Sequence, residues 1–169
     1  MAHDGAMQAN RRLIVMRHAK AGDLTGGPDA ERALNPRGQR DAAAAGDWLR
    51  EHGFIPGLVL CSTARRARQT WRQTAAGLPG TVTVREDPRL YEAGSDESLD
   101  IIRQAPPDVV TLMYVGHNPA AQDLAAGLLG EMAGFPAAAI AVIGLAVPWA
   151  AVAPGDGDLI ALWTPRLAS

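Results

Sequence analysis

A length of 169 residues fits one domain with a sizeable core, and 16 basic against 18 acidic residues leave no charge excess that would favour nucleic-acid or membrane partners. The single cysteine, Cys61, excludes an internal disulfide and a cysteine-based zinc site, which agrees with a reducing, cytoplasmic location. Residues 1–12 lack the apolar block of a secretion signal, so we expect a mobile tail followed by one domain over residues 13–169. No later stretch reaches the ~20 apolar residues that a membrane span needs.

The first predicted strand is Leu13–Met16, four apolar residues in a row that are typical of a short buried strand. Arg17 and His18 follow at once, so the strand end delivers two side chains that can bind an anion. On this stretch alone, a surface charge and a loop histidine explain the pair equally well. Residues 22–31 are rich in Gly, Asp and Pro, and predict an exposed loop close to His18.

The first predicted helix has signals at both of its ends. Asn35 is a favourable N-cap, and Pro36 suits the first helical position. Apolar residues continue at helical spacing up to Gly53, which is a typical helix stop. We therefore expect a helix between Pro36 and Gly53.

A second apolar run, residues 58–61, predicts a strand, after which Ser62 can cap a helix over residues 63–78. Small and apolar residues share one face of this helix, and three of its four arginines share another. Arg66 belongs to neither face. It lies in the first turn, where a helix N-terminus favours an anion, so it is the best candidate ligand among the four.

The strongest strand signal is Val109–Val115, which is continuous and β-branched and is therefore expected near the centre of a sheet. Gly116 and His117 follow it, and Asn118 as cap with Pro119 in first position predicts another helix. The other elements expected before residue 130 are a strand at 81–84, a turn at Asp87–Pro88, a loop at 90–94 and a helix capped by Ser95.

The C-terminal part differs, because strands over residues 139–147 and 158–163 are joined by a turn and predict an antiparallel pair. The alternation of strands and helices up to residue 130 indicates an α/β fold. Together these patterns predict a three-layer αβα sandwich with a mixed, mostly parallel central sheet.

Polar residues follow three of the predicted strands directly. In open α/β sheets, ligands bind at the carboxyl edge of the strands, so these residues are expected to meet there. Two histidines, two arginines and helix N-termini at one edge suit a phosphoryl group, whose charge is spread over three oxygens. The pairs are Arg17 with His18, Ser62 with Arg66, and His117 with Asn118.

Five short motifs stand out along the chain: Arg17-His18-Ala19-Lys20, Leu34-Asn35-Pro36-Arg37-Gly38, Ser62-x-x-x-Arg66-Ala67-x-Gln69-Thr70, Leu90-Tyr91-Glu92-Ala93 and Gly116-His117-Asn118-Pro119. This set resembles the histidine phosphatase superfamily, in its SixA-like phosphohistidine phosphatase branch. The resemblance covers roughly residues 13 to 165, and the motifs fall in the family's order. It implies the phosphoglycerate mutase-like, or histidine phosphatase, fold.

The resemblance also implies the roles of the site residues. His18 would be the nucleophile that takes up the phosphoryl group, and Arg17, Arg66 and His117 would hold the phosphoryl oxygens. Nearby cations lower the pKa of an imidazole and so keep it nucleophilic near neutral pH. No metal and no cofactor are expected. Asn35 and Asn118 would support the loops of the site.

Glu92 is the residue whose role the sequence leaves open. In relatives that hydrolyse phosphate esters, an acidic residue protonates the leaving oxygen, and such acids typically contribute ~10²–10⁴-fold. A phosphohistidine needs less help, because imidazole leaves as a group whose conjugate acid has a pKa of ~6.5. A catalytic Glu92 and a solvated loop carboxylate are therefore equally consistent with the sequence.

The expected substrate is a phosphorylated protein, a phosphohistidine carrier domain, because a chain this short lacks the insertions that enclose small substrates in larger relatives. The alternative is a phosphomonoesterase acting on a sugar phosphate or a nucleotide, and mutase activity is less favoured. A catalytically silent phosphoprotein-binding module is a further alternative, but binding alone would not need His18.

Other hydrolase classes fit less well. A cysteine phosphatase needs an arginine six residues after its cysteine, and that position after Cys61 is Ala67. A metallohydrolase built on His18 and His117 would need further ligands, and the sequence has no His-x-x-x-His pair. No phosphate-binding loop of the Gly-x-x-x-x-Gly-Lys type is present either.

Overall fold

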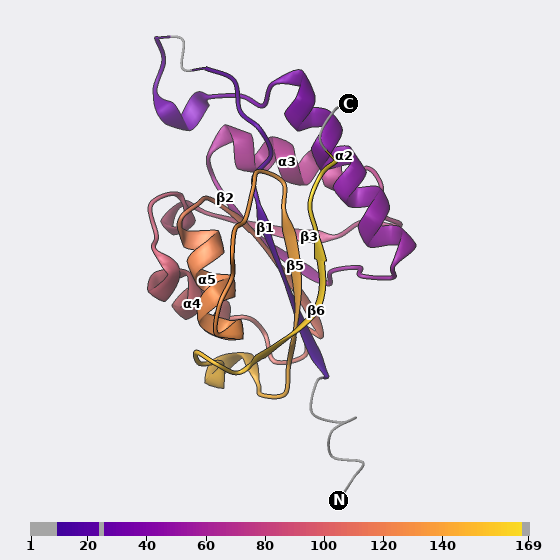
Figure 1. Cartoon of the computed structure of the whole chain (residues 1–169), viewed down its shortest axis with the longest axis vertical. Coiled ribbons are helices and arrows are strands. Elements are labelled where there is room, and N and C mark those ends of the chain that lie inside the picture. Colours follow the sequence, from indigo (N-terminus) through magenta and orange to yellow (C-terminus); the bar gives the residue numbers. More distant parts are fainter. Residues whose placement is uncertain (1–9, 24–25, 167–169) are drawn as a thin grey trace, which may run out of the picture.

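The structure is a computed structural model that describes residues 10–23 and 26–166. All six strands belong to one sheet, with the order β3-β2-β4-β1-β5-β6 (Figure 1). The strands are β1 (Arg11–Arg17), β2 (Leu58–Ser62), β3 (Thr83–Asp87), β4 (Thr111–Gly116), β5 (Ile140–Leu145) and β6 (Gly157–Trp163). The helices are α2 (Pro36–Glu51), α3 (Arg65–Ala75), α4 (Ser95–Arg103) and α5 (Ala120–Leu129), with short 3-10 helices η1 (Asp29–Glu31), η2 (Pro88–Tyr91) and η3 (Trp149–Ala151).

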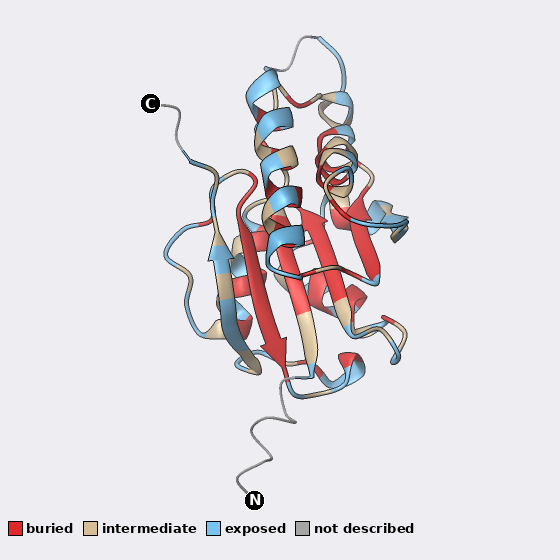
Figure 2. Cartoon of the chain, turned by 90° about the vertical axis from the view of Figure 1, so that its right-hand side faces the viewer, coloured by how far each residue is buried: buried red, intermediate tan, exposed pale blue. Residues whose placement is uncertain are grey.

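The sheet is mixed and mostly parallel, as the sequence predicts. Strands β1, β2, β3 and β4 pair in parallel, whereas β5 is antiparallel to β1 and β6 is antiparallel to β5. Helices cover the sheet on two sides, with α2 and α3 on one face and α4 and α5 on the other (Figures 1 and 2). The predicted three-layer αβα sandwich is therefore confirmed.

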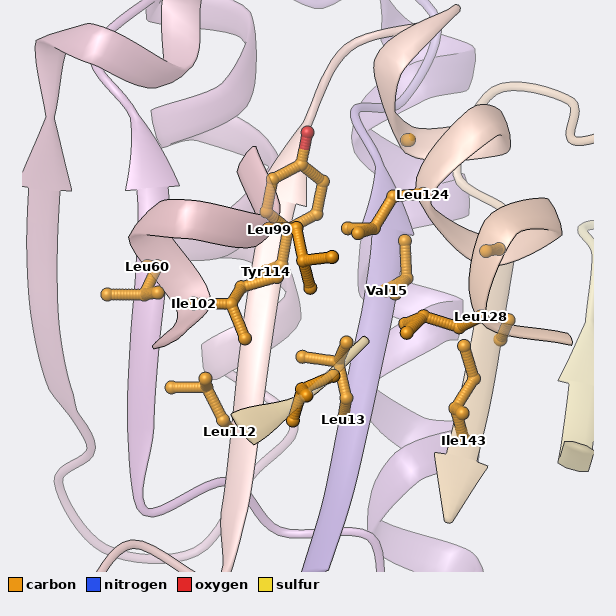
Figure 3. Close-up of a cluster of buried hydrophobic side chains, with 14 of the residues drawn as sticks. Leu13, Val15, Leu60, Leu99, Ile102, Leu112, Tyr114, Leu124, Leu128 and Ile143 are labelled. Carbon is orange, nitrogen blue, oxygen red and sulfur yellow. The ribbon is translucent and has the colours of Figure 1, made fainter. Parts of the chain in front are cut away.

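The core follows from the alternation of side chains along β1, which is buried on both faces. Leu13 and Val15 point toward α4 and α5, where they meet apolar side chains of both helices (Figure 3). Ile14 and Met16 point the other way, into a second apolar cluster under α2 and α3. All four side chains are fully buried, which is why this strand lacks any polar alternation.

Several element boundaries differ from the predictions. The tail expected over residues 1–12 is too long, because β1 begins at Arg11, whose partner is Leu145 of β5. Residues 1–9 lie outside the described residues. Strand β3 spans Thr83–Asp87 rather than residues 81–84, because Thr83 pairs with Leu58, the first residue of β2. The expected turn at Asp87 is replaced by a cap, since the Asp87 carboxylate accepts a bond from the Arg89 amide at the start of η2.

The helix starts also differ in detail. Asn35 caps α2 as predicted, since its Oδ1 accepts a bond of 2.7 Å from the Gly38 amide. Ser95 is the first residue of α4 rather than its cap, and Gly94 occupies the cap position. Similarly, α5 begins at Ala120, one residue later than expected. None of the helices in the described part of the chain is long and apolar enough to cross a membrane.

Candidate active site

The two histidines meet where the connections of neighbouring strands leave toward opposite faces of the sheet. After β1 the chain turns to α2 on one face, whereas after β4 it turns to α5 on the other. Such a switch point opens a crevice at the carboxyl ends of the strands. The parallel register ends with Arg17 opposite Gly116, and the His18 amide donates to the Gly116 carbonyl at 2.9 Å. The rings of His18 and His117 consequently lie 5.1 Å apart, centre to centre.

The His18 ring is fixed by the backbone beside it. Its Nδ1 lies 2.7 Å from the Ala19 carbonyl oxygen, which can only accept, so Nδ1 carries a proton. Burial, followed by the charges of His117, Arg66 and Arg17, lowers the pKa of His18 to about 3, against the opposing effect of the bond to Ala19. Near neutral pH the ring is therefore neutral, and Nε2 holds the free lone pair that a nucleophile needs.

The segment that follows His18 is held by the start of α2. The Asn35 amide donates to the Lys20 carbonyl at 3.0 Å, and the Asn35 side chain caps the helix. A Cβ atom at Gly38 would collide with the same Lys20 carbonyl, so only glycine permits this approach. Asn35 and Gly38 thus account for the Leu-Asn-Pro-Arg-Gly motif, since they place the backbone next to the site.

Arg17 and Asn118 share one backbone acceptor. Arg17 Nη1 and Asn118 Nδ2 donate to the carbonyl of Phe135, at 3.1 and 2.9 Å. The Asn118 Oδ1 also accepts a bond from the Gln122 amide in the first turn of α5, at 3.2 Å. Asn118 therefore ties the start of α5 to the segment before β5, and Arg17 is held against the same point.

Ser62 does not cap a long helix from residue 63, contrary to the prediction. Helix α3 starts at Arg65, with Ala64 at the cap position and no side-chain cap. The Ser62 hydroxyl is fully buried, accepts a bond from the Ala64 amide and lies 2.8 Å from Nε2 of His117. This contact leaves Nδ1 as the His117 nitrogen available to a ligand. Burial, followed by the charge of Arg66, lowers the pKa of His117 to about 4, so this ring is neutral as well.

Arg66 lies at the start of α3 and is buried, with its guanidinium held by Asp29 of η1. Nη1 donates to the Asp29 carbonyl and Nη2 to the Asp29 carboxylate, both at 2.9 Å. The phenol of Tyr91 donates to the same carboxylate at 2.5 Å. Asp29 and Tyr91 were not among the candidates from the sequence. Tyr91 belongs to the Leu90-Tyr91-Glu92-Ala93 motif, which could have marked it as a residue of the site. Nothing in the sequence of the loop around Asp29 singles that residue out.

These residues surround a cavity of about 430 Å³ that is strongly cationic. Within residues 10–23 and 26–166, six buried side-chain nitrogens lack a hydrogen-bond partner, and four of them belong to residues lining this cavity. An unpaired buried donor costs about 1–3 kcal/mol, so the donors are suited to oxygens of a bound anion. The Nε atoms of Arg17, Arg32 and Arg66 are such donors, and Nδ1 of His117 is one in the tautomer in which Nε2 accepts the bond from the Ser62 hydroxyl.

Three of the candidate residues do not line this cavity, and one of them is Ser62, whose contact with His117 is described above. Asn35 acts on the backbone of Lys20, as described above, and Glu92 is exposed at the end of η2. Lys20 and Arg32 do line it, although the sequence did not single them out. In the part of the chain that the structure describes, no group of three or more His, Cys, Asp or Glu side chains could hold a metal ion.

Comparisons with known proteins agree with this geometry. The family model described as the histidine phosphatase superfamily (branch 1) matches residues 13–122. An uncharacterised protein of Mycobacterium tuberculosis is 40% identical over 162 residues, which cover 89% of this chain and 100% of that protein. A solved structure from Nakamurella multipartitia, provisionally described as the phosphohistidine phosphatase SixA, is 33% identical with a TM-score of 0.82, and the match covers 93% of this chain and 97% of that one. A second structure with the same provisional description, from Agrobacterium tumefaciens, is 29% identical with a TM-score of 0.81 over 92% of this chain and 98% of that one.

Proposed function

The chain belongs to the histidine phosphatase superfamily, as a SixA-like phosphatase, and we propose that it removes the phosphoryl group from phosphohistidine in a protein through a covalent intermediate on His18. The observation that carries this proposal is the bond from His18 Nδ1 to the Ala19 carbonyl. It directs the lone pair of a neutral imidazole away from the backbone, in a cavity lined by cations. This arrangement is that of a prepared nucleophile beside a binding site for an anion.

The reaction takes place in two displacements at phosphorus. In the first, the Nε2 lone pair of His18 forms a bond to phosphorus while the P–N bond of the substrate breaks. The substrate ring carries a proton on its other nitrogen, so the electron pair of the broken bond leaves with a neutral imidazole. Arg17, Arg66 and His117 hold the phosphoryl oxygens while this charge moves. In the second, water attacks the phosphohistidine, releases phosphate and restores the His18 lone pair.

The leaving group is what favours phosphohistidine over an ester. An alkoxide needs a general acid, whereas imidazole leaves readily because its conjugate acid has a pKa of ~6.5. The acidic residue nearest the arginines, Asp29, has no proton to give, since bonds from Tyr91 and Arg66 lower its pKa to about 2. Glu92 is exposed and does not line the cavity. A site with no general acid beside the phosphoryl group favours a substrate whose leaving group departs readily, such as the imidazole of phosphohistidine.

Rapid quench with a protein carrying ³²P-phosphohistidine tests the proposal. We expect an acid-labile label on the wild-type chain and none on His18→Ala. His52→Ala is a matched control, because the exposed His52 also has its Nδ1 bonded to a backbone carbonyl, that of Trp48. A wild-type chain that hydrolyses alkyl phosphates as fast as the phosphohistidine protein would replace the proposed substrate with a small ester. A chain that binds the phosphoprotein without labelling or turnover would contradict the catalytic role of His18.

A further inference from the structure

Arg66 is held by one residue on a different segment of the chain. Its side chain is only 7% exposed, and both terminal nitrogens donate to Asp29, to the backbone carbonyl and to the carboxylate. The other carboxylate oxygen of Asp29 lies 3.3 Å from Nη2 of Arg32. Arg66 and Arg32 line the cavity and Asp29 does not, so the carboxylate holds the arginines from outside the cavity.

Tyr91 completes this arrangement from a third segment. Its hydroxyl donates to the carboxylate oxygen that also receives Arg66 Nη2. Its ring centre lies 5.9 Å from the guanidinium carbon of Arg66 and 5.7 Å from the ring centre of His117, to which it is nearly perpendicular at 81°. Tyr91 therefore contacts both Arg66 and His117, and it links them to Asp29.

We propose that Asp29 and Tyr91 are positioning residues, a clamp that orients Arg66 toward the phosphoryl group. The inference rests on the proposed function, since it concerns the same reaction. Arginine has five N–H groups, and Asp29 occupies one on each terminal nitrogen, which leaves three, including the buried Nε, for the substrate. A guanidinium that is fixed in this way loses little entropy when the anion binds.

Two other roles for Asp29 fit the geometry less well. A general acid would need a proton, but Asp29 is ionised near neutral pH, as described above. An internal competitor for the anion would need to occupy the cavity, and Asp29 does not line it. The acidic residue of this site thus acts through Arg66 rather than on the substrate.

The test compares Asp29→Asn and Tyr91→Phe with Glu31→Gln as the matched control. Glu31 lies on the same short helix, is exposed and carries the same charge, so its variant reports the effect of losing one negative charge near the site. The readout is the rate at which ³²P from the phosphohistidine protein appears on His18 at saturating substrate. We expect a loss on the order of 10–100-fold for Asp29→Asn and about 10-fold for Tyr91→Phe, with Glu31→Gln at the wild-type rate, because a displacement of about 1 Å can cost ~10²-fold.

The same substitutions in an Arg66→Ala background separate positioning from a general effect on the fold. The ion pair of Asp29 with Arg32 is partly exposed and contributes little, so the loss that acts through Arg66 should vanish in this background. Each double variant should therefore stay within about 2-fold of Arg66→Ala. Losses as large as in the wild-type background would overturn the inference, as would a faster rate for Asp29→Asn, which would identify the carboxylate as a competitor. If ³²P never appears on the wild-type chain, the proposed function is contradicted. If the wild type is labelled and Asp29→Asn is labelled at the same rate, only the clamp is contradicted.

Discussion

The two sides of the candidate active site are held in different ways. On the sheet side, Arg17, His18 and His117 follow β1 and β4, whose backbones pair in register up to the residue before each histidine. On the loop side, Asp29 and Tyr91 come from two short 3-10 helices. The side chain of Arg66 donates to Asp29, and the Tyr91 hydroxyl donates to the Asp29 carboxylate. A substitution on the sheet side removes one side chain and leaves the paired backbone in place. A substitution of Asp29 or Tyr91 on the loop side also frees the side chain of Arg66 to move.

The largest effect is expected on the sheet side, where Arg17→Ala and His117→Ala each remove a group that we place against the phosphoryl oxygens. Loss of one such donor typically costs ~10²–10³-fold in rate, and we expect this loss in the turnover of the phosphohistidine protein. Arg103→Ala is the matched control, because Arg103 also donates to a backbone carbonyl, that of Val152. A loss below about 10-fold for both variants would mean that the loop side carries most of the binding.

The protonation of the two histidines gives the second prediction. Because burial and nearby cations lower the pKa of His18 to about 3 and of His117 to about 4, both rings stay neutral as the pH falls from 8 to 5. Their ring resonances in NMR should not move over this range, but should titrate near 6.5 when the chain is unfolded in urea. The unfolded chain then binds protons that the folded chain does not, so the free energy of unfolding should decrease as the pH falls below about 6.5. A midpoint above 6 for either folded ring would contradict the neutral nucleophile.

Ser62→Ala tests a further contact on the sheet side, since Ser62 at the end of β2 holds His117 after β4. We expect a loss on the order of 10-fold in kcat/KM, which corresponds to one net hydrogen bond of about 1.4 kcal/mol. The matched control is Ser98→Ala, another fully buried serine, whose hydroxyl lies 3.4 Å from that of Tyr114 rather than beside a histidine of the site. Equal effects of the two substitutions would assign Ser62 to packing alone.

The sequence is a good guide to the sheet side and a poor guide to the loop side. Arg17, His18 and His117 follow strong strand signals, and the rule that ligands bind at the carboxyl edge is enough to bring them together. The same rule brings Ser62 to this edge, but the sequence predicts a helix cap for it. Its contact with His117 depends on the pairing of β2 with β4, and strand order is not visible in a sequence. Asp29 lies in a polar loop without periodicity, and its reach to Arg66 depends on tertiary contacts across 37 residues.

Glu92→Gln is the smallest expected effect, and it tests whether the loop side contributes an acid. Glu92 is exposed and does not line the cavity, so we expect less than about a 2-fold change in kcat/KM for the phosphohistidine protein. A general acid contributes ~10²–10⁴-fold, and a loss of that size would show that η2 moves to bring Glu92 to the leaving group. An alkyl phosphate is the more sensitive probe, because its leaving oxygen depends on a proton from an acid of the enzyme, whereas the phosphohistidine ring takes its proton from solvent near neutral pH. A loss of activity with the alkyl phosphate alone would therefore assign to Glu92 a role restricted to esters. Two adjacent residues of the loop side would then have different roles, because Tyr91 positions Arg66 and Glu92 selects the substrate.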